Sequence, residues 1–243
     1  MADAAKKTAL LIGDGKMGRL IAQTLQADGT FELLGSYGRD QVAGLDLEAP
    51  AADVALDFSN KAGLDHALAY VRRTGAALVS GTTGYSEEEL AQIRDLGEVA
   101  PVIWSANYSL GVAVLRRLAG EAARALEGFD VEIVETHHNQ KADAPSGTAK
   151  LLLEAVAPQG AEVAYGREGM VGARPQGQVG MHSLRGGTVA GTHEVHLFGP
   201  DEEVCLTHRA TSRQIFVNGA VAAAKRLVGR PAGFYTFDEL MFS

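Results

Sequence analysis

The 243-residue sequence contains one cysteine, Cys205, so an intramolecular disulfide is excluded. A single cysteine is typical of proteins from a reducing compartment, and we expect Cys205 to be a small apolar residue within a strand. No apolar run approaches the roughly 18 residues that span a membrane. The first residues also lack the apolar core of a signal peptide. These absences together predict a cytoplasmic protein.

Basic residues are scarce, with 22 Lys and Arg against 30 Asp and Glu, which gives a formal net charge of −8. This balance argues against a general nucleic-acid-binding protein, because no run of Lys or Arg offsets it. Zinc motifs such as H-E-x-x-H or C-x-x-C are also missing, so no metal site is predicted. The apolar content of 46% is ordinary for a globular protein and permits one large domain or two modest ones.

In the first ~110 residues, short apolar runs alternate with helical patterns, which predicts a doubly wound parallel sheet of the α/β class. The expected strands are Thr8–Ile12, Phe31–Tyr37, Val54–Ser59, Ala76–Ser80 and Pro101–Trp104. The expected helices are Arg19–Leu25, Asn60–Arg73 and a segment that begins at Ser86.

The second half has a different pattern. It opens with a long helix, and three of its strands follow one another without a helix between them, which predicts a mixed or mostly antiparallel sheet. The expected helices are Leu110–Glu127, Ala149–Ala157 and Ile215–Leu227, and the expected strands are Asp130–Glu135, Met181–Leu184, Gly191–Phe198 and Val204–Ala210. Residues 160–180 show little periodicity, and Phe234–Phe242 is a short tail with a possible strand.

A G-x-G-x-x-G motif lies between the first strand and the first helix, and its residues are Gly13, Asp14, Gly15, Lys16, Met17 and Gly18. In dinucleotide-binding folds the first glycine permits the tight turn, the second admits the pyrophosphate, and the third lets helix and strand pack closely. The motif alone is a weak signal that a plain turn also satisfies. Its flanking strand and helix favour a dinucleotide site.

The residues after the second strand bear on cofactor choice. NAD-binding folds usually place an acid there for the ribose 2′-hydroxyl, but this chain has Gly38 followed by Arg39 and Asp40. A basic residue suits a 2′-phosphate, and Lys16 adds positive charge from the glycine loop. We therefore favour NADPH over NADH, although Arg39 is equally compatible with a solvent-facing charge.

Two further loops follow predicted parallel strands, at the edge where cofactors bind in such sheets. We predict cofactor contacts from both loops, while turns without a ligand remain the alternative. The residues concerned are Gly81, Thr82, Thr83, Ser105, Ala106, Asn107 and Tyr108.

The segment Glu132–Ala149 combines groups that suit proton transfer and anion binding. A predicted strand opens into a loop with His137, His138 and Lys141, and Ser146 or Thr148 can cap the following helix. Histidine titrates near neutral pH, and helix N-termini bind anions. Arg185 and His193 lie on later strands and are equally compatible with a substrate face, with local ion pairing or with a subunit contact.

The same segment resembles the signature of the 4-hydroxy-tetrahydrodipicolinate reductase (dihydrodipicolinate reductase) family, E-[IV]-x-E-x-H-x-x-x-K-x-D-x-P-S-G-T-A, at every specified position. Similarity extends to the glycine loop, Gly81–Gly84, Ala106–Ser109, Arg185–Gly187, Gly191–His193 and the segment from Phe234 onwards.

The resemblance implies a Rossmann-type domain of residues 1–108 plus 219–243, with an inserted α+β domain, residues 109–218, for substrate binding and oligomerisation. It implies NAD(P)H-dependent reduction of 4-hydroxy-tetrahydrodipicolinate to tetrahydrodipicolinate with loss of water, and a homotetramer. His137 falls at the acid/base position and Lys141 at the proton-donor position. His138, Gly147 and Thr148 fall where the family holds the carboxylates of the substrate.

Two alternatives remain compatible with the glycine loop. Another two-domain NAD(P) oxidoreductase, such as an amino-acid dehydrogenase, would share the loop but need not contain the His-His-x-x-Lys-x-Asp-x-Pro-Ser-Gly-Thr run. A non-catalytic dinucleotide sensor could lose both His137 and Lys141, and this chain has both.

Overall fold

The computed structural model describes residues 6–243 and consists of two compact units. The first unit joins the chain up to Ser109 with Gln214–Ser243, and the second unit is Leu110–Arg213. Within the described residues, none of the helices has the length and apolar character that crossing a membrane requires.

The first unit contains a six-stranded sheet in which every neighbouring pair of strands is parallel. The strands are β1 (Lys7–Ile12), β2 (Phe31–Tyr37), β3 (Val54–Asp57), β4 (Ala77–Ser80), β5 (Pro101–Trp104) and β11 (Gly233–Tyr235). They lie in the order β11-β5-β4-β3-β1-β2. β1, β3 and β4 are buried almost throughout, which is why they read as continuous apolar runs in the sequence.

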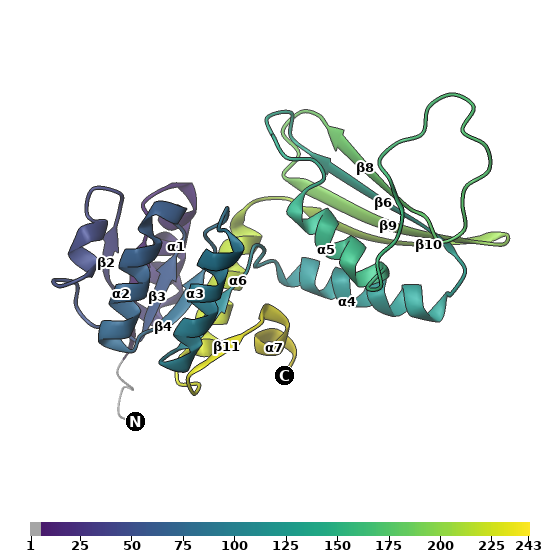
Figure 1. The fold of residues 1–243 in the computed structure, drawn as a ribbon. Helices are drawn as coiled ribbons and strands as arrows, with labels where there is room; N and C mark the ends of the chain where they lie inside the picture. The colour runs from purple at the N-terminus through teal and green to yellow at the C-terminus, as the bar shows by residue number, and fades with distance from the viewer. Residues whose placement is uncertain (1–5) are drawn as a thin grey trace. The chain divides into compact units, whose positions relative to one another are not determined.

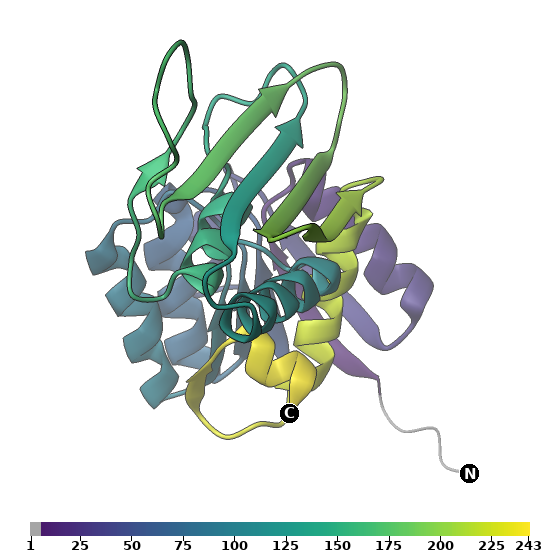
Figure 2. The same ribbon diagram turned by 90° about the vertical axis from the view of Figure 1, so that its right-hand side faces the viewer.

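Helices cover both faces of this sheet (Figures 1 and 2). They are α1 (Lys16–Asp28), α2 (Leu64–Thr74), α3 (Glu87–Asp95) and α6 (Gln214–Leu227). α1 packs against α6, while apolar side chains of α2 and α3 share one core cluster with alternate residues of the strands. Short 3₁₀ turns occur at Val42–Leu45, Lys61–Gly63 and Leu96–Glu98. This arrangement confirms the predicted Rossmann-type layer structure.

The strand order reverses between β1 and β3. β1 is followed by β2 on one side, but the chain then returns to place β3, β4 and β5 on the other side. Ligands in doubly wound sheets bind beyond the carboxyl ends of the strands at such a reversal. In this unit that position lies between Gly13, after β1, and Phe58, after β3.

The second unit is a five-stranded mixed sheet packed against two helices (Figure 1). The elements are α4 (Leu110–Ala125), β6 (Asp130–His137), α5 (Gly147–Val156), β7 (Val163–Ala164), β8 (Val179–Arg185), β9 (Gly191–Gly199) and β10 (Glu202–Ala210). The order is β10-β9-β6-β8-β7, with β6 antiparallel to β9 and parallel to β8. The predicted mixed sheet is confirmed.

A single core joins this sheet to its helices. Ile133 of β6 and Val195 of β9 are fully buried, and they cluster with Ala119 of α4 and Leu152 of α5. Because side chains alternate along a strand, the opposite face of the sheet carries polar residues such as Glu132. One face of β6 therefore contributes to the core, and the other carries polar side chains.

Among the α-helices and β-strands of the described residues, the sequence analysis missed two. β7 is only two residues long, too short for any periodicity to reveal it. The tail contains the expected strand, β11, but it then forms α7 (Phe237–Phe242), whose capping box pairs Thr236 with Glu239. Cys205 lies in β10 as expected, but it is exposed rather than part of the apolar core.

Candidate active site

The glycine loop between β1 and α1 has the backbone geometry that its motif predicts. Gly13 has a φ of +108°, and a Cβ there would lie 2.6 Å from the carbonyl oxygen of Phe58. A Cβ on Gly18 would lie 2.1 Å from the carbonyl oxygen of Gly13. By contrast, nothing lies within 4 Å of a Cβ position on Gly15, the N-cap of α1, and no side chain caps that helix. The exposed helix N-terminus at Gly15 therefore leaves room for a phosphate.

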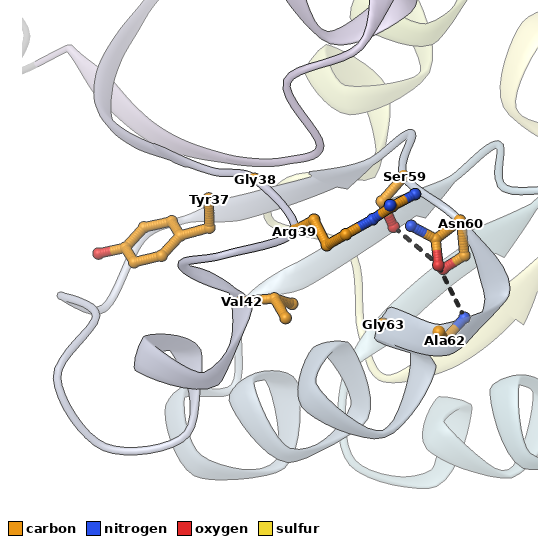
Figure 3. Close-up of a pocket in the computed structure, with 8 residues that line it drawn as sticks. All are labelled: Tyr37, Gly38, Arg39, Val42, Ser59, Asn60, Ala62 and Gly63. Atoms are coloured by element: carbon orange, nitrogen blue, oxygen red, sulfur yellow. Dashed lines mark hydrogen bonds between the residues drawn. The ribbon is translucent and has the colours of Figure 1, made fainter.

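Two cavities share Arg39, Ser59 and Asn60, and the glycine loop lines one of them. One of about 510 Å³ lies at the reversal of strand order and is lined by Gly13, Asp14, Gly15, Arg39, Asp40, Phe58, Ser59 and Asn60. The other, of about 320 Å³, is lined by Tyr37, Gly38, Arg39, Val42, Ser59, Asn60, Ala62 and Gly63 (Figure 3). Arg39 lines both, and Figure 3 shows its side chain extended toward Ser59 and Asn60. The cavities and the glycine loop together fit an extended dinucleotide.

The structure gives a physical reason for Gly38 at the position where an acid is common. A Cβ on Gly38 would lie 2.4 Å from a carboxylate oxygen of Asp14. Because that oxygen is the exposed end of a flexible side chain that can move aside, a second carboxylate here would be opposed mainly by the like charge of Asp14. Asp14 and Lys16 are themselves exposed at the start of the loop. Met17 is half-buried.

The loops after β4 and β5 meet at the same edge of the sheet, as predicted. The amide of Ser105 donates to the carbonyl of Ser80 at 3.1 Å, and the indole Nε1 of Trp104 donates to the carbonyl of Thr82 at 2.8 Å. A Cβ on Gly81 would lie 2.2 Å from the ring of Phe58. Thr83 and Ala106 are exposed at this edge. The structure thus collects these residues beside the end of β3.

The side chains of three predicted cofactor residues, Thr82, Asn107 and Tyr108, have internal partners. The hydroxyl of Tyr108 donates to the carbonyl of Ser80 at 2.7 Å, and burial raises the pKa of this phenol. Thr82 is buried, and its hydroxyl oxygen accepts the amide of Ser59 at 3.0 Å. The side chain oxygen of Asn107 accepts the amide of Ser109 at 2.8 Å. These side chains shape the loops that border the cavity.

Sequence reasoning missed a buried acid in this unit. Asp57, 2% exposed at the end of β3, accepts hydrogen bonds from Ser59 Oγ at 2.6 Å and from Ser80 Oγ at 2.9 Å. Its second oxygen also accepts from the hydroxyl of Tyr85 at 3.2 Å. Asp57 therefore fastens the loop after β3 to β4. An acid that ends an otherwise apolar run was the available signal.

In the second unit, His137 is the last residue of β6 and has a half-buried imidazole. Its Nδ1 forms a short hydrogen bond with Oε2 of Glu135, and its ring makes an edge-to-face contact with His193 at 5.1 Å between centroids. Burial lowers the pKa of His137, Glu135 opposes this effect, and the charges of Lys141 and Arg185 reinforce it. The residue can therefore exchange a proton near or below neutral pH.

Glu135 is fully buried and remains charged because of its partners. Its Oε1 accepts from Nη2 of Arg185 at 2.8 Å and from the amide of Ser146 at 3.3 Å. Burial pushes the pKa of Glu135 upward, but hydrogen bonds from Arg185, Ser183 and His137 outweigh burial and hold that pKa below its usual value.

The loop after β6 carries Lys141 and His138. Nζ of Lys141 donates to both oxygens of Asp143, at 2.7 and 2.9 Å. The amide of His138 donates to the carbonyl of Val189 at 2.8 Å, and Nη2 of Arg185 donates to the carbonyl of Asp143 at 2.8 Å. The loop, with its cis peptide bond before Pro145, is thus fixed at several points along its backbone.

α5 begins beside these groups. Ser146 is its N-cap, as one of the two predicted candidates, and its hydroxyl oxygen accepts the amide of Ala149 at 3.2 Å. The same oxygen lies 3.0 Å from Nε2 of His193. Gly147 and Thr148 form the first turn, and nothing lies within 4 Å of a Cβ position on Gly147. The amides of this turn are suited to bind a carboxylate.

The electrostatics of this cluster favours an anion. Glu135, His137 and His193 have ligand-type atoms within 4.8 Å of one another, an arrangement that is also found in metal sites. However, Arg185 already forms an ion pair with the carboxylate of Glu135, and Lys141 adds a second positive charge near His137. To bind here, a metal ion would have to displace Arg185 from Glu135 and would lie close to the positive charge of Lys141.

The structure brings the predicted residues His137, Lys141 and Gly147 together around the start of α5. Three additional side chains join them: Glu135, Ser146 and His193. Sequence analysis considered Ser146 as a cap and left His193 open, while it gave Glu135 no role. The signal for Glu135 was its spacing from His137, because residues two apart on a strand point to the same face.

Two protein-family models together match most of the chain. Residues 8–108 match the family model described as "Dihydrodipicolinate reductase, N-terminus", and residues 111–241 match "Dihydrodipicolinate reductase, C-terminus". The chain belongs to the dihydrodipicolinate reductase family. This result confirms the predicted family and the predicted enzyme class, an oxidoreductase.

Individual relatives align with nearly the whole length of this chain. The 4-hydroxy-tetrahydrodipicolinate reductase of Caldanaerobacter subterraneus subsp. tengcongensis is 39% identical, over 94% of this chain and 95% of its own. The enzyme of the same name from Exiguobacterium sp. is 41% identical, over 95% and 94%. A dipicolinate-bound dihydrodipicolinate reductase structure from Paenisporosarcina sp. TG-14 has a TM-score of 0.77 at 24% identity, covering 98% of this chain and 100% of that one. That structure confirms the fold.

From the burial of His193 we predict that the folded protein loses stability in acid. Burial, together with the charges of His137 and His208, lowers the pKa of His193 to about 4. As pH falls below about 6.5, the unfolded chain binds a proton at this position that the folded protein excludes, so stability is full above pH 6.5 and declines toward pH 4. From this group alone, the free energy of unfolding should fall by on the order of 3 kcal/mol.

Urea unfolding at pH 7, 5.5 and 4 measures this effect. We expect His193→Gln to lose less stability on acidification than the wild type. The control is His66→Gln, because the side chain of His66 is 30% exposed. The same loss in all three proteins would contradict the prediction.

Proposed function

We propose that this chain uses NAD(P)H to reduce 4-hydroxy-tetrahydrodipicolinate to tetrahydrodipicolinate with loss of water, in lysine and diaminopimelate biosynthesis. The observation that carries the proposal is the cluster around the start of α5, where His137, Lys141 and the first-turn amides of Gly147 and Thr148 lie together. The relatives named for this reaction support it over nearly their whole length. The alternatives of an amino-acid dehydrogenase and a non-catalytic sensor are therefore set aside.

The first unit would hold the cofactor. Gly15 would face the pyrophosphate at the N-terminus of α1, and the cavities lined by Arg39 would receive the adenosine half. The loops Gly81–Thr83 and Ser105–Tyr108 would border the other half. When bound, the cofactor supplies the hydride, while the protein supplies position and electrostatics. The boundaries 1–108 and 219–243 remain our proposal for this dinucleotide-binding domain.

The substrate-binding domain, which we propose as residues 109–218 and which contains the second unit, would bind the substrate. A cyclic dicarboxylate needs cations and N–H donors, and these are supplied by His138, Lys141 and the amides of Gly147 and Thr148. Hydride addition leaves negative charge on the substrate, which must then be protonated. Lys141 is the proposed proton donor, and His137 the acid/base group beside it.

Substitution of the two proposed proton-transfer residues tests this assignment. His137→Gln and Lys141→Ala should each lower kcat by about 10²–10⁴-fold, the usual contribution of a positioned acid or base. Both should still bind NADPH, because the glycine loop belongs to the other unit. The assay supplies the condensation product of pyruvate and aspartate semialdehyde and follows the absorbance of reduced nicotinamide.

The matched control is Lys150→Ala, because Lys150 is an exposed lysine of α5. It should retain wild-type turnover. Absence of any NADPH or NADH oxidation by the wild type would exclude the proposed reaction. Unchanged turnover in both His137→Gln and Lys141→Ala would leave the reaction standing and refute the proposed proton donors.

We further propose that NADPH is the preferred cofactor. Gly38 leaves no acid at the usual ribose position, and the guanidinium of Arg39 borders both cavities. Arg39→Ala should therefore raise the KM for NADPH about 10-fold or more, since a charge-assisted hydrogen bond contributes about 1.5–3 kcal/mol, and should change the KM for NADH much less. Arg72→Ala, an exposed arginine of α2, is the control. Equal effects on the two cofactors would remove the phosphate role of Arg39.

A homotetramer is the proposed assembly, on the basis of the family resemblance. Sedimentation equilibrium of the purified protein should give about four times the 25.5 kDa mass of one chain. A monomer or a dimer that persists at micromolar concentrations would contradict this proposal.

A further inference from the structure

Glu135 has no part in the proposed reaction, yet it is the most buried charge of the second unit. Its residue exposure is 0%, and it lies on β6 two residues before His137. A buried carboxylate is costly unless it is paired and hydrogen-bonded, so its retention here calls for a physical explanation.

The contacts of its two oxygens are of different kinds. Oε1 accepts from Nη2 of Arg185 at 2.8 Å and from the amide of Ser146 at 3.3 Å. Oε2 faces Nδ1 of His137. One carboxylate thus connects the proposed acid/base residue with the N-cap of α5, which precedes the proposed carboxylate-binding turn.

We propose that Glu135 is a positioning residue that fixes which nitrogen of His137 carries the proton and holds that imidazole in register with the start of α5. This inference rests on the proposed role of His137. A carboxylate only accepts hydrogen bonds, so the neutral imidazole beside it must carry its hydrogen on Nδ1. Nε2 then remains available for proton exchange with a ligand.

The surroundings of Nε2 agree with this assignment. A Cβ on Gly191 would lie 3.1 Å from Nε2, so the absence of a side chain there leaves space beside that nitrogen. The other charged or titratable groups that face His137 are Lys141, Arg185 and His193. The first two carry positive charge, and Glu135 is the only anion among these groups, which makes it the group that favours a protonated imidazole.

Glu135→Gln is the decisive substitution because it keeps the shape and inverts one hydrogen bond. Two donors, Arg185 and the Ser146 amide, converge on the Oε1 position, so the amide oxygen must occupy it. The NH₂ group then faces Nδ1 of His137 and can only donate. Neutral His137 is therefore forced into the opposite tautomer, with its hydrogen on Nε2.

Three kinetic results are expected for Glu135→Gln. The kcat should fall on the order of 10²-fold, as misplacement of a catalytic group typically produces. The KM for the substrate should rise much less than kcat falls. The limb of the pH profile that reports His137 should move to lower pH, because the anion that raises the pKa of His137 has been removed.

Glu132→Gln is the matched control. Glu132 lies three residues earlier on β6, on the opposite face, and bridges Arg167, Arg174 and His182. It has comparable ion pairs but does not touch His137, so loss of general stability would appear in both variants. Glu132→Gln should keep the wild-type pH profile and a kcat within about threefold of the wild type. Equal kcat values and pH profiles in the two variants would overturn the proposal.

Nitrogen-15 NMR of the imidazole rings gives a readout that does not depend on turnover. At a pH above the pKa of His137, the wild type should show the Nδ1–H form, and Glu135→Gln the Nε2–H form. A wild-type Nε2–H tautomer would overturn the proposal even if the variant failed to fold. The same spectra remain interpretable if the wild type lacks the proposed reductase activity, so failure of the reaction and failure of the positioning role are distinguishable.

Discussion

The arrangement of the candidate site in the second unit depends on one buried negative charge, which its neighbours must compensate. Glu135 is withdrawn from water, and burial alone would protonate it or exclude it from the core. Hydrogen bonds from Arg185, Ser183 and His137 keep it ionised. One of those donors, His137, is the candidate acid/base group. The electrostatic requirement of the carboxylate thereby becomes a geometric constraint on the imidazole, on α5 and, through Arg185, on the backbone of Asp143.

The first unit has a different constraint. Backbone segments must pack closely against their neighbours, and the start of α1 must leave room for a ligand. Gly13, Gly18 and Gly81 lie where a Cβ would fall between 2.1 and 2.6 Å from a neighbouring atom, so each permits contact within the fold. Gly15 is different, because its side-chain position is open. Three glycines thus permit close packing at the carboxyl ends of β1, β3 and β4. Gly15 instead leaves space at the N-terminus of α1.

Most of the fold could be predicted because strong local patterns determine it. Buried parallel strands appear as apolar runs, and the capping residues Ser86 and Ser146 mark the starts of α3 and α5. β7 could not be predicted, because two residues have no period and its pairing with β8 is a tertiary interaction. The site showed the same division. The sequence indicated His137 and Lys141 by their chemistry, but the partnership of Ser146 with His193 joins residues 47 positions apart.

The two glutamates of β6 show why chemical type alone does not assign a role. Glu132 and Glu135 both have arginine and histidine partners, and the pKa of each is held below its usual value, that of Glu132 to about 2. Glu132 binds Arg167 and Arg174 of the loop between β7 and β8, so its ion pairs secure that loop against the polar face. Glu135 points to the opposite, buried face, where its histidine is also the candidate acid/base group. A three-residue step along one strand therefore separates an acid that secures a loop from one whose proposed role is to fix the protonated nitrogen of the candidate acid/base imidazole.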